Sequence, residues 1–177
     1  MDQQAKILRR IRWILGAFVV GLVLSGMTAV PVQWELRLLT AVLGMPEAAA
    51  PEAYTGLRHW LATVQLAVND AYGRWPFLAY ACDWLAFAHV AIAVVFVGAI
   101  RDPVRNVWVI TFGLIACVLV VPTAMVFGAI RGIPPAWRLI DCAFGAVGFV
   151  PLWIARRYTL RLAGSAGHSS NGGLSTT

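Results

Sequence analysis

The chain has 177 residues, of which 60% are hydrophobic and only 12% are charged, and its formal net charge is +6. Soluble domains carry roughly 25% charged residues, so this composition excludes an ordinary soluble fold and indicates an integral membrane protein. The basic residues are spread over the ends of apolar segments and do not form one basic face, which argues against nucleic acid as a partner.

Four apolar segments are each long enough to cross a bilayer, since a hydrocarbon core about 30 Å thick requires about 20 helical residues. They predict an all-α, polytopic four-transmembrane-helix bundle that forms a single domain over residues 1–160. The predicted spans are residues 11–30, 77–100, 107–130 and 136–155.

Lysine and arginine are unequally divided between the two sets of span ends. Nine lie at one set of ends: Lys6, Arg9, Arg10, Arg12, Arg101, Arg105, Arg156, Arg157 and Arg161. Five lie at the other: Arg37, Arg58, Arg74, Arg131 and Arg138. By the positive-inside rule, this asymmetry predicts that both termini face the cytoplasm.

Two segments are predicted to lie outside the bilayer. Residues 31–76, between the first and second spans, contain apolar residues at helical spacing, so we expect an amphipathic helical segment on the periplasmic side. Residues 161–177 are rich in Gly, Ser and Thr, which predicts a disordered cytoplasmic tail.

Small residues recur at helical spacing within two of the spans. Gly21, Ser25 and Thr28 form one such stripe, and Gly145 and Gly148 form another. Small residues allow transmembrane helices to approach closely, so both stripes are expected to contact neighbouring helices.

Ionisable residues inside the predicted spans define a candidate site, because a charged group within a membrane usually faces a bundle interior or a water-filled cavity. Asp83 and Asp141 are at similar predicted depths, Arg138 is one turn from Asp141, and Arg131 occupies the connecting turn. His89 lies deeper. These five residues are predicted to form a ligand-binding pocket with Asp83, Arg131, Arg138 and Asp141 at its rim and His89 at its floor.

His89 has two interpretations. It is either a structural histidine bonded to a neighbouring backbone carbonyl, or a proton carrier or ligand at the floor of the cavity. The sequence contains no Cys-x-x-Cys motif. We interpret its three cysteines as packing residues: Cys82, Cys117 and Cys142. A disulfide between Cys82 and Cys142 is left open.

No cofactor and no metal are predicted. Paired His or Cys ligands at zinc spacing are absent from the sequence. Bis-histidine haem ligation would have to combine His89, the only histidine within a span, with His59 in the loop.

Three stretches carry a resemblance to other proteins: Tyr80 to His89, Arg101 to Asn106, and Ile130 to Cys142. In these stretches the chain resembles an uncharacterised family of bacterial four-span inner-membrane proteins. That resemblance implies a membrane location and no activity.

The sequence leaves three functions open. The first is a periplasm-facing pocket that binds an amphipathic or anionic lipid-like molecule, with an anionic head near Arg131 and Arg138. The second is an accessory subunit bound to a membrane-protein partner or to further copies of the chain. The third is an enzyme in which Asp83 or His89 performs acid-base chemistry on a lipid or isoprenoid head group.

Overall fold

The computed structural model describes residues 3–45 and 50–171, with side chains described up to residue 165. Within these ranges the chain is helical and contains no strand. The α-helices are α1 (Gln3–Thr28), α2 (Val32–Val42), α3 (Gly56–Arg74), α4 (Tyr80–Arg101), α5 (Val107–Ile130) and α6 (Pro135–Asn171), and the short 3-10 helices are η1 (Pro51–Ala53) and η2 (Pro76–Ala79).

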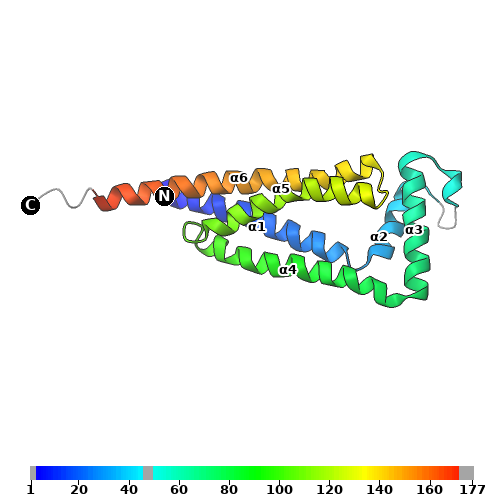
Figure 1. The fold of residues 1–177 in the computed structure, drawn as a ribbon. Helices are drawn as coiled ribbons and strands as arrows, with labels where there is room; N and C mark the ends of the chain where they lie inside the picture. The colour runs from blue at the N-terminus through cyan, green and yellow to red at the C-terminus, as the bar shows by residue number, and fades with distance from the viewer. Residues whose placement is uncertain (1–2, 46–49, 172–177) are drawn as a thin grey trace, which may run out of the picture.

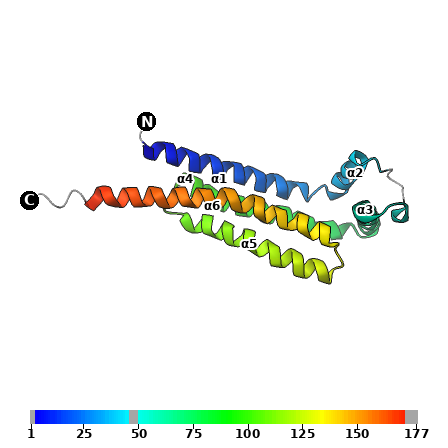
Figure 2. The same cartoon turned by 90° about the horizontal axis from the view of Figure 1, so that it is seen from above.

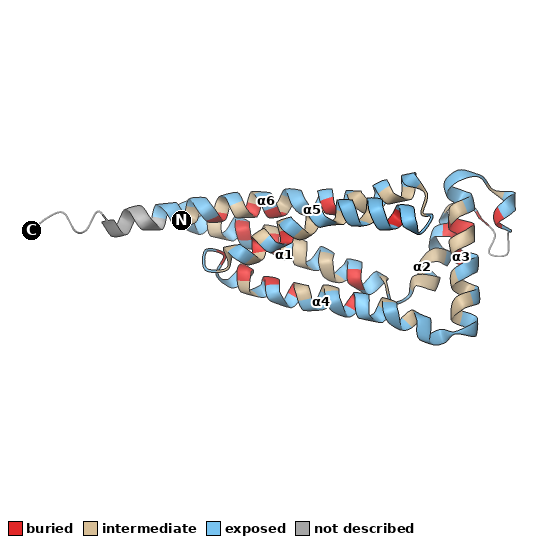
Figure 3. Cartoon of the chain, viewed as in Figure 1, coloured by how far each residue is buried: buried red, intermediate tan, exposed pale blue. Residues whose placement is uncertain are grey.

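Four of these helices, α1, α4, α5 and α6, are long and apolar enough to cross a membrane, as the sequence predicts. Much of their length is exposed (Figure 3), and the exposed residues include large apolar ones such as Trp13 at 75% exposure and Val94 at 65%. Such a surface would be costly in water and is favourable against lipid. The fold is therefore that of a multi-pass membrane protein.

The four long helices are antiparallel neighbours with unequal contacts. Helix α1 packs against α4 and α6, and α5 packs against α6, whereas α4 and α5 contact each other least. The start of α1, the turn between α4 and α5, and the later part of α6 lie at one end of the bundle, which we call the terminal end (Figures 1 and 2).

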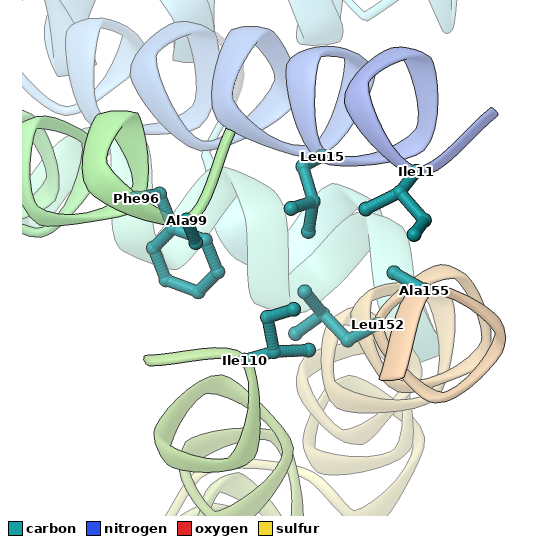
Figure 4. Packing of buried hydrophobic residues seen from close by; sticks show 7 residues of the cluster. All are labelled: Ile11, Leu15, Phe96, Ala99, Ile110, Leu152 and Ala155. Atoms are coloured by element: carbon teal, nitrogen blue, oxygen red, sulfur yellow. The ribbon is translucent and has the colours of Figure 1, made fainter. Parts of the chain in front are cut away.

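A buried apolar cluster joins all four long helices near the terminal end (Figure 4). Phe96 of α4 is fully buried there between side chains of the other three helices. The members of the cluster are Ile11, Leu15, Phe96, Ala99, Ile110, Leu152 and Ala155. From this cluster α4 and α5 diverge towards the opposite end of the bundle (Figure 1).

Polar side chains at the terminal end satisfy the last carbonyls of α4, which have no partner within the helix. The Arg12 guanidinium donates to the carbonyl oxygens of Ile100 and Arg101 at 3.1 and 3.2 Å. The Asn106 amide donates to the carbonyls of Gly98 and Asp102 at 3.1 and 2.9 Å. Arg12 therefore connects α1 to the end of α4 as well as contributing positive charge.

The segment between α1 and α4 folds into a helical pair at the opposite end, where α3 runs across the bundle axis (Figure 1). The Gln33 amide of α2 donates to the Asn69 side chain of α3 at 3.2 Å. The Tyr72 hydroxyl and the Cys82 thiol hydrogen-bond at 3.3 Å, which connects α3 to α4. The hydrogen bond to Cys82 raises the pKa of Tyr72 to about 12, and burial and the negative charges of the Cys82 and Asp83 side chains act in the same direction. The phenol is protonated at neutral pH.

Two sequence-based boundaries differ from the structure. Helix α1 begins at Gln3, before the predicted span, and α6 continues to Asn171. The predicted disorder therefore does not begin at residue 161. Leu162 packs against the buried cluster, and Gln4 donates to the Ser165 hydroxyl at 3.3 Å. These contacts with the rest of the bundle stabilise a segment whose composition favours disorder. Residues 172–177 lie outside the described ranges.

The glycines of the two predicted stripes of small residues differ in how closely they approach a neighbouring helix. A Cβ atom on Gly145 would lie 2.6 Å from the backbone oxygen of Cys117, so this glycine does allow α6 to approach α5. On α1, however, a Cβ atom on Gly21 would meet nothing within 4 Å. Gly26, outside the predicted stripe, is the α1 glycine in close contact with α4.

We predict that Gly145→Ala lowers the free energy of unfolding by about 1–3 kcal/mol, because the obstructing atom belongs to the backbone and cannot rotate away. Gly16→Ala is the matched control. It has open space around its Cβ position and should be neutral or stabilising by about 0.5–1 kcal/mol. Unfolding of both variants in detergent would be followed by circular dichroism. Equal stability of the two variants would contradict the close approach of α5 and α6.

Candidate functional site

A cavity of about 450 Å³ lies between the four long helices. This volume falls within the range of roughly 300–1,000 Å³ that is typical of small-molecule sites. The lining residues come from all four helices and are mostly apolar: Phe18, Gly21, Leu22, Ser25, His89, Ile92, Phe96, Phe112, Gly113, Ala116, Cys117, Val120, Asp141, Phe144, Gly145, Val147 and Gly148.

The buried cluster closes the cavity towards the terminal end. The rings of Phe18 and Phe96 pack together with centroids 5.0 Å apart. A Cβ atom on Gly113 would lie 2.8 Å from both Phe96 and Leu152, so α5 approaches closely at this level. The cavity is therefore formed where the helices separate beyond this floor.

His89 is one of two ionisable residues that the sequence assigned to the site and that do line the cavity. Its Nδ1 lies 2.8 Å from the Leu85 carbonyl oxygen one turn earlier. Because a carbonyl only accepts hydrogen bonds, Nδ1 carries the proton of the neutral ring, and Nε2 keeps a lone pair as an acceptor. His89 thus makes the backbone hydrogen bond that the structural interpretation expects and also lines the cavity, and its role as a proton carrier or ligand stays a prediction.

Gly26 of α1 fixes where the imidazole lies. A Cβ atom on Gly26 would be 2.5 Å from the Cβ of His89 and 3.3 Å from the Ala86 carbonyl oxygen. Only glycine allows α1 to pack this closely on α4 at the level of His89. Gly26 is therefore a positioning residue that sequence reasoning missed, although it lies one position from the predicted Ser25.

Asp141 is the second ionisable residue that lines the cavity. It shares its side of α6 with Gly145 and Gly148, which also line the cavity. Within the described part of the chain its carboxylate has neither a hydrogen bond nor an ion pair. The only salt bridge there joins Arg74 to Asp70, at 2.9 Å. A carboxylate without a partner among apolar side chains is unfavourable unless something else compensates it.

Arg138 does not pair with Asp141, although residues three apart on a helix can do so. Its aliphatic stem packs on Gly128 of α5, where a Cβ atom would lie 2.6 Å from Cδ. Its Nη1 donates to the Met125 carbonyl at 3.4 Å, and its Nε is buried without a partner. Three helical residues place the two side chains only about 60° apart, so it is the contacts with Gly128 and Met125 that direct Arg138 to α5, while Asp141 lines the cavity.

Asp83 and Arg131 also lie away from the cavity. Arg131 is exposed in the turn that follows α5. Asp83 is exposed on the outer surface of α4, where it lines a shallow depression with Tyr80, Trp84 and Phe87. Asp83 precedes His89 by six residues, which places the two side chains about 120° apart on the helix. Since His89 faces inward, Asp83 faces outward.

The structure thus brings together two of the five predicted site residues and adds polar groups that were not assigned to the site. Ser25 and Cys117 line the same cavity. Both were interpreted as packing residues, and only the arrangement of the helices shows their position. All three cysteines are free thiols, and no group of three His, Cys, Asp or Glu side chains in the described ranges could hold a metal ion.

The fold and cavity define a class of protein: a four-helix membrane bundle with a mostly apolar cavity, open on one side, that is lined by one histidine and one aspartate. Comparison of this chain with family models, with curated proteins and with solved structures finds no match. The function must therefore be argued from the chemistry of the cavity.

That chemistry is dominated by hydrogen-bond acceptors. The Asp141 carboxylate accepts at both oxygens, the Nε2 atom of His89 accepts, and the Ser25 hydroxyl can do either. No lysine or arginine lines the cavity. The site is therefore complementary to a molecule that is mostly apolar and donates hydrogen bonds at its polar end.

We predict that His89 is the Nδ1-protonated tautomer when neutral, because the Leu85 carbonyl requires a donor. Nitrogen NMR of histidine-labelled protein in lipid bilayers distinguishes the two tautomers. His59→Gln and His168→Gln would leave His89 as the only signal. A neutral ring protonated at Nε2 would contradict the geometry and would leave His89 without an acceptor nitrogen towards the cavity.

Proposed function

We propose that this protein binds an amphipathic, lipid-like molecule in the cavity between its four long helices. The observation that supports this most directly is the Asp141 carboxylate, which faces an apolar cavity of about 450 Å³ without a partner in the described part of the chain. Charged groups within membranes are usually paired, and a bound ligand would supply the missing partner.

The polar end of the ligand donates hydrogen bonds, and a primary ammonium group suits the site best. It would place a positive charge against Asp141 and direct its remaining hydrogens towards His89 Nε2 and Ser25. Hydrogen bonds between charged groups are stronger than neutral ones. An anionic head, considered from the sequence because of Arg131 and Arg138, finds neither arginine in the cavity and would be repelled by Asp141.

The apolar part of the ligand occupies the remainder of the cavity, whose walls include Phe18, Phe112 and Phe144. A hydrocarbon chain that enters from the bilayer gains little from burial alone, so this contact contributes through close packing against the walls. The polar groups then select which amphipathic molecule is retained.

The proposed setting is a bacterial inner membrane with the terminal end in the cytoplasm. The long helices bring Arg12, Arg101, Arg105, Arg156 and Arg157 to the terminal end. This agrees with the positive-inside rule. The α2–α3 pair then lies outside the bilayer on the periplasmic side, and the cavity is in the periplasmic half of the membrane.

Cysteine labelling tests this orientation. In a background with Cys82, Cys117 and Cys142 replaced by alanine, Glu52→Cys and Ser165→Cys place single thiols at exposed positions of opposite ends. We expect a membrane-impermeant maleimide to label Glu52→Cys in intact bacterial cells and Ser165→Cys only after permeabilisation. The reverse pattern would invert the orientation, and labelling of both in intact cells would contradict it.

Binding is tested with three probes that share one hydrocarbon chain: oleylamine, oleyl alcohol and oleate. In phosphatidylcholine nanodiscs we expect oleylamine to bind most tightly and oleate most weakly. Asp141→Asn should weaken oleylamine binding roughly ten- to a hundredfold, which corresponds to the loss of one charge-assisted hydrogen bond of about 1.5–3 kcal/mol.

Asp83→Asn is the matched control, because it makes the same chemical change on the outer surface of the neighbouring helix α4. It should leave oleylamine binding unchanged. If oleate bound more tightly than oleylamine, or if the two asparagine variants behaved alike, the proposed site would be wrong.

A further inference from the structure

The cavity has a continuation on the outer surface of the bundle, between α4 and α5. A second depression of about 330 Å³ lies there and is lined by Ala91, Ile92, Val95, Trp108, Val109 and Phe112. All six are apolar or aromatic. We call this depression the α4–α5 groove.

Two residues belong to both the groove and the cavity. Ile92 of α4 and Phe112 of α5 line each of them, so these side chains form the partition between the internal cavity and the outer surface. Both are partly exposed, Phe112 at 41%. The helices that carry them, α4 and α5, are the pair of neighbouring long helices with the fewest contacts.

The partition lies close to the firmly packed floor. Phe96, one helical turn from Ile92, and Gly113, next to Phe112, are in close contact, and the fully buried Ala99 and Ile110 lie in the cluster beneath them. Rotation of the Ile92 and Phe112 side chains would therefore join the two spaces without moving either helix. Side-chain rotamer changes of this kind are fast compared with helix movements.

From this arrangement we propose that the α4–α5 groove is the lateral entrance of the cavity and the binding site for the end of a long hydrocarbon chain. This proposal rests on the proposed function. The ligand enters from the bilayer between α4 and α5, its polar end reaches Asp141 and His89, and its chain passes Ile92 and Phe112 to lie along the groove. The groove contains no charged side chain, which suits a hydrocarbon chain and excludes a polar peptide.

The ligand class that follows is a long single-chain amphiphile, with a chain longer than the cavity itself can hold. A short-chain analogue would occupy only the cavity and would not need the groove. Comparing the affinities of ligands with short and long hydrocarbon chains therefore distinguishes the contribution of the groove from that of the polar site.

The experiment compares octylamine with oleylamine in phosphatidylcholine nanodiscs. Ala91→Trp fills the groove from a position that does not line the cavity. We expect it to weaken oleylamine binding about tenfold, or about 1.4 kcal/mol, because the indole occupies the space of the chain end, and to leave octylamine binding unchanged. Ala143→Trp, at an exposed position of α6 that lines neither space, is the control and should change neither affinity.

A second measurement uses the wild-type bundle and does not depend on the folding of a filled variant. Oleylamine brominated at its double bond should quench the fluorescence of Trp108, which lines the groove. Trp108→Phe should remove most of the saturable quenching, whereas Trp13→Phe, which removes an exposed tryptophan of α1, should not.

The outcomes separate the two proposals. If octylamine binding is lost in Asp141→Asn but oleylamine is insensitive to Ala91→Trp and does not quench Trp108, the groove proposal is overturned and the proposed function stands. If octylamine shows no Asp141-dependent binding, the proposed function fails. Equal loss of both amines in Ala91→Trp would also overturn the groove proposal, because the variant would then disturb the cavity itself.

Discussion

The packing of Phe96 at the terminal end is the contact on which the rest of the structure depends. Its fully buried ring lies within the one cluster that joins all four long helices, and Gly113 and Phe18 both contact it. Because the helices are held together there, they can separate towards the opposite end without losing the bundle. The cavity forms because the helices are held tightly together only near the terminal end.

Two glycines allow the close helix–helix contacts that place polar side chains at the cavity. Gly26 allows α1 to pack on His89, and Gly145 allows α6 to pack on the backbone of α5 beside Asp141. Within a membrane there is little hydrophobic driving force between helices, so close van der Waals packing of this kind contributes much of the association energy. The same contacts that stabilise the bundle therefore orient His89 and Asp141 towards the cavity.

The separation of Arg138 from Asp141 determines the chemistry of the proposed binding site. Had the two paired, as residues three apart on a helix can, the carboxylate would be neutralised and the cavity would be almost wholly apolar. Instead the arginine stem fills the space left by Gly128, and its guanidinium lies against the carbonyls near the end of α5. A cation is favourable at that end of a helix. Asp141 is left to a partner that the chain itself does not supply.

The sequence by itself determined the number of long helices, their approximate positions and the division of basic residues between the two ends, because hydrophobic length and charge are local properties. It also identified His89 and Asp141 as unusual within apolar spans. Only the tertiary structure decided that these two face one cavity while Asp83, Arg131 and Arg138 do not. The rotation of each helix about its axis depends on which side chains and glycines meet across helices, and such contacts join residues far apart in the chain. For the same reason the extension of α6 beyond residue 160 and the role of Gly26 became visible only in the folded bundle.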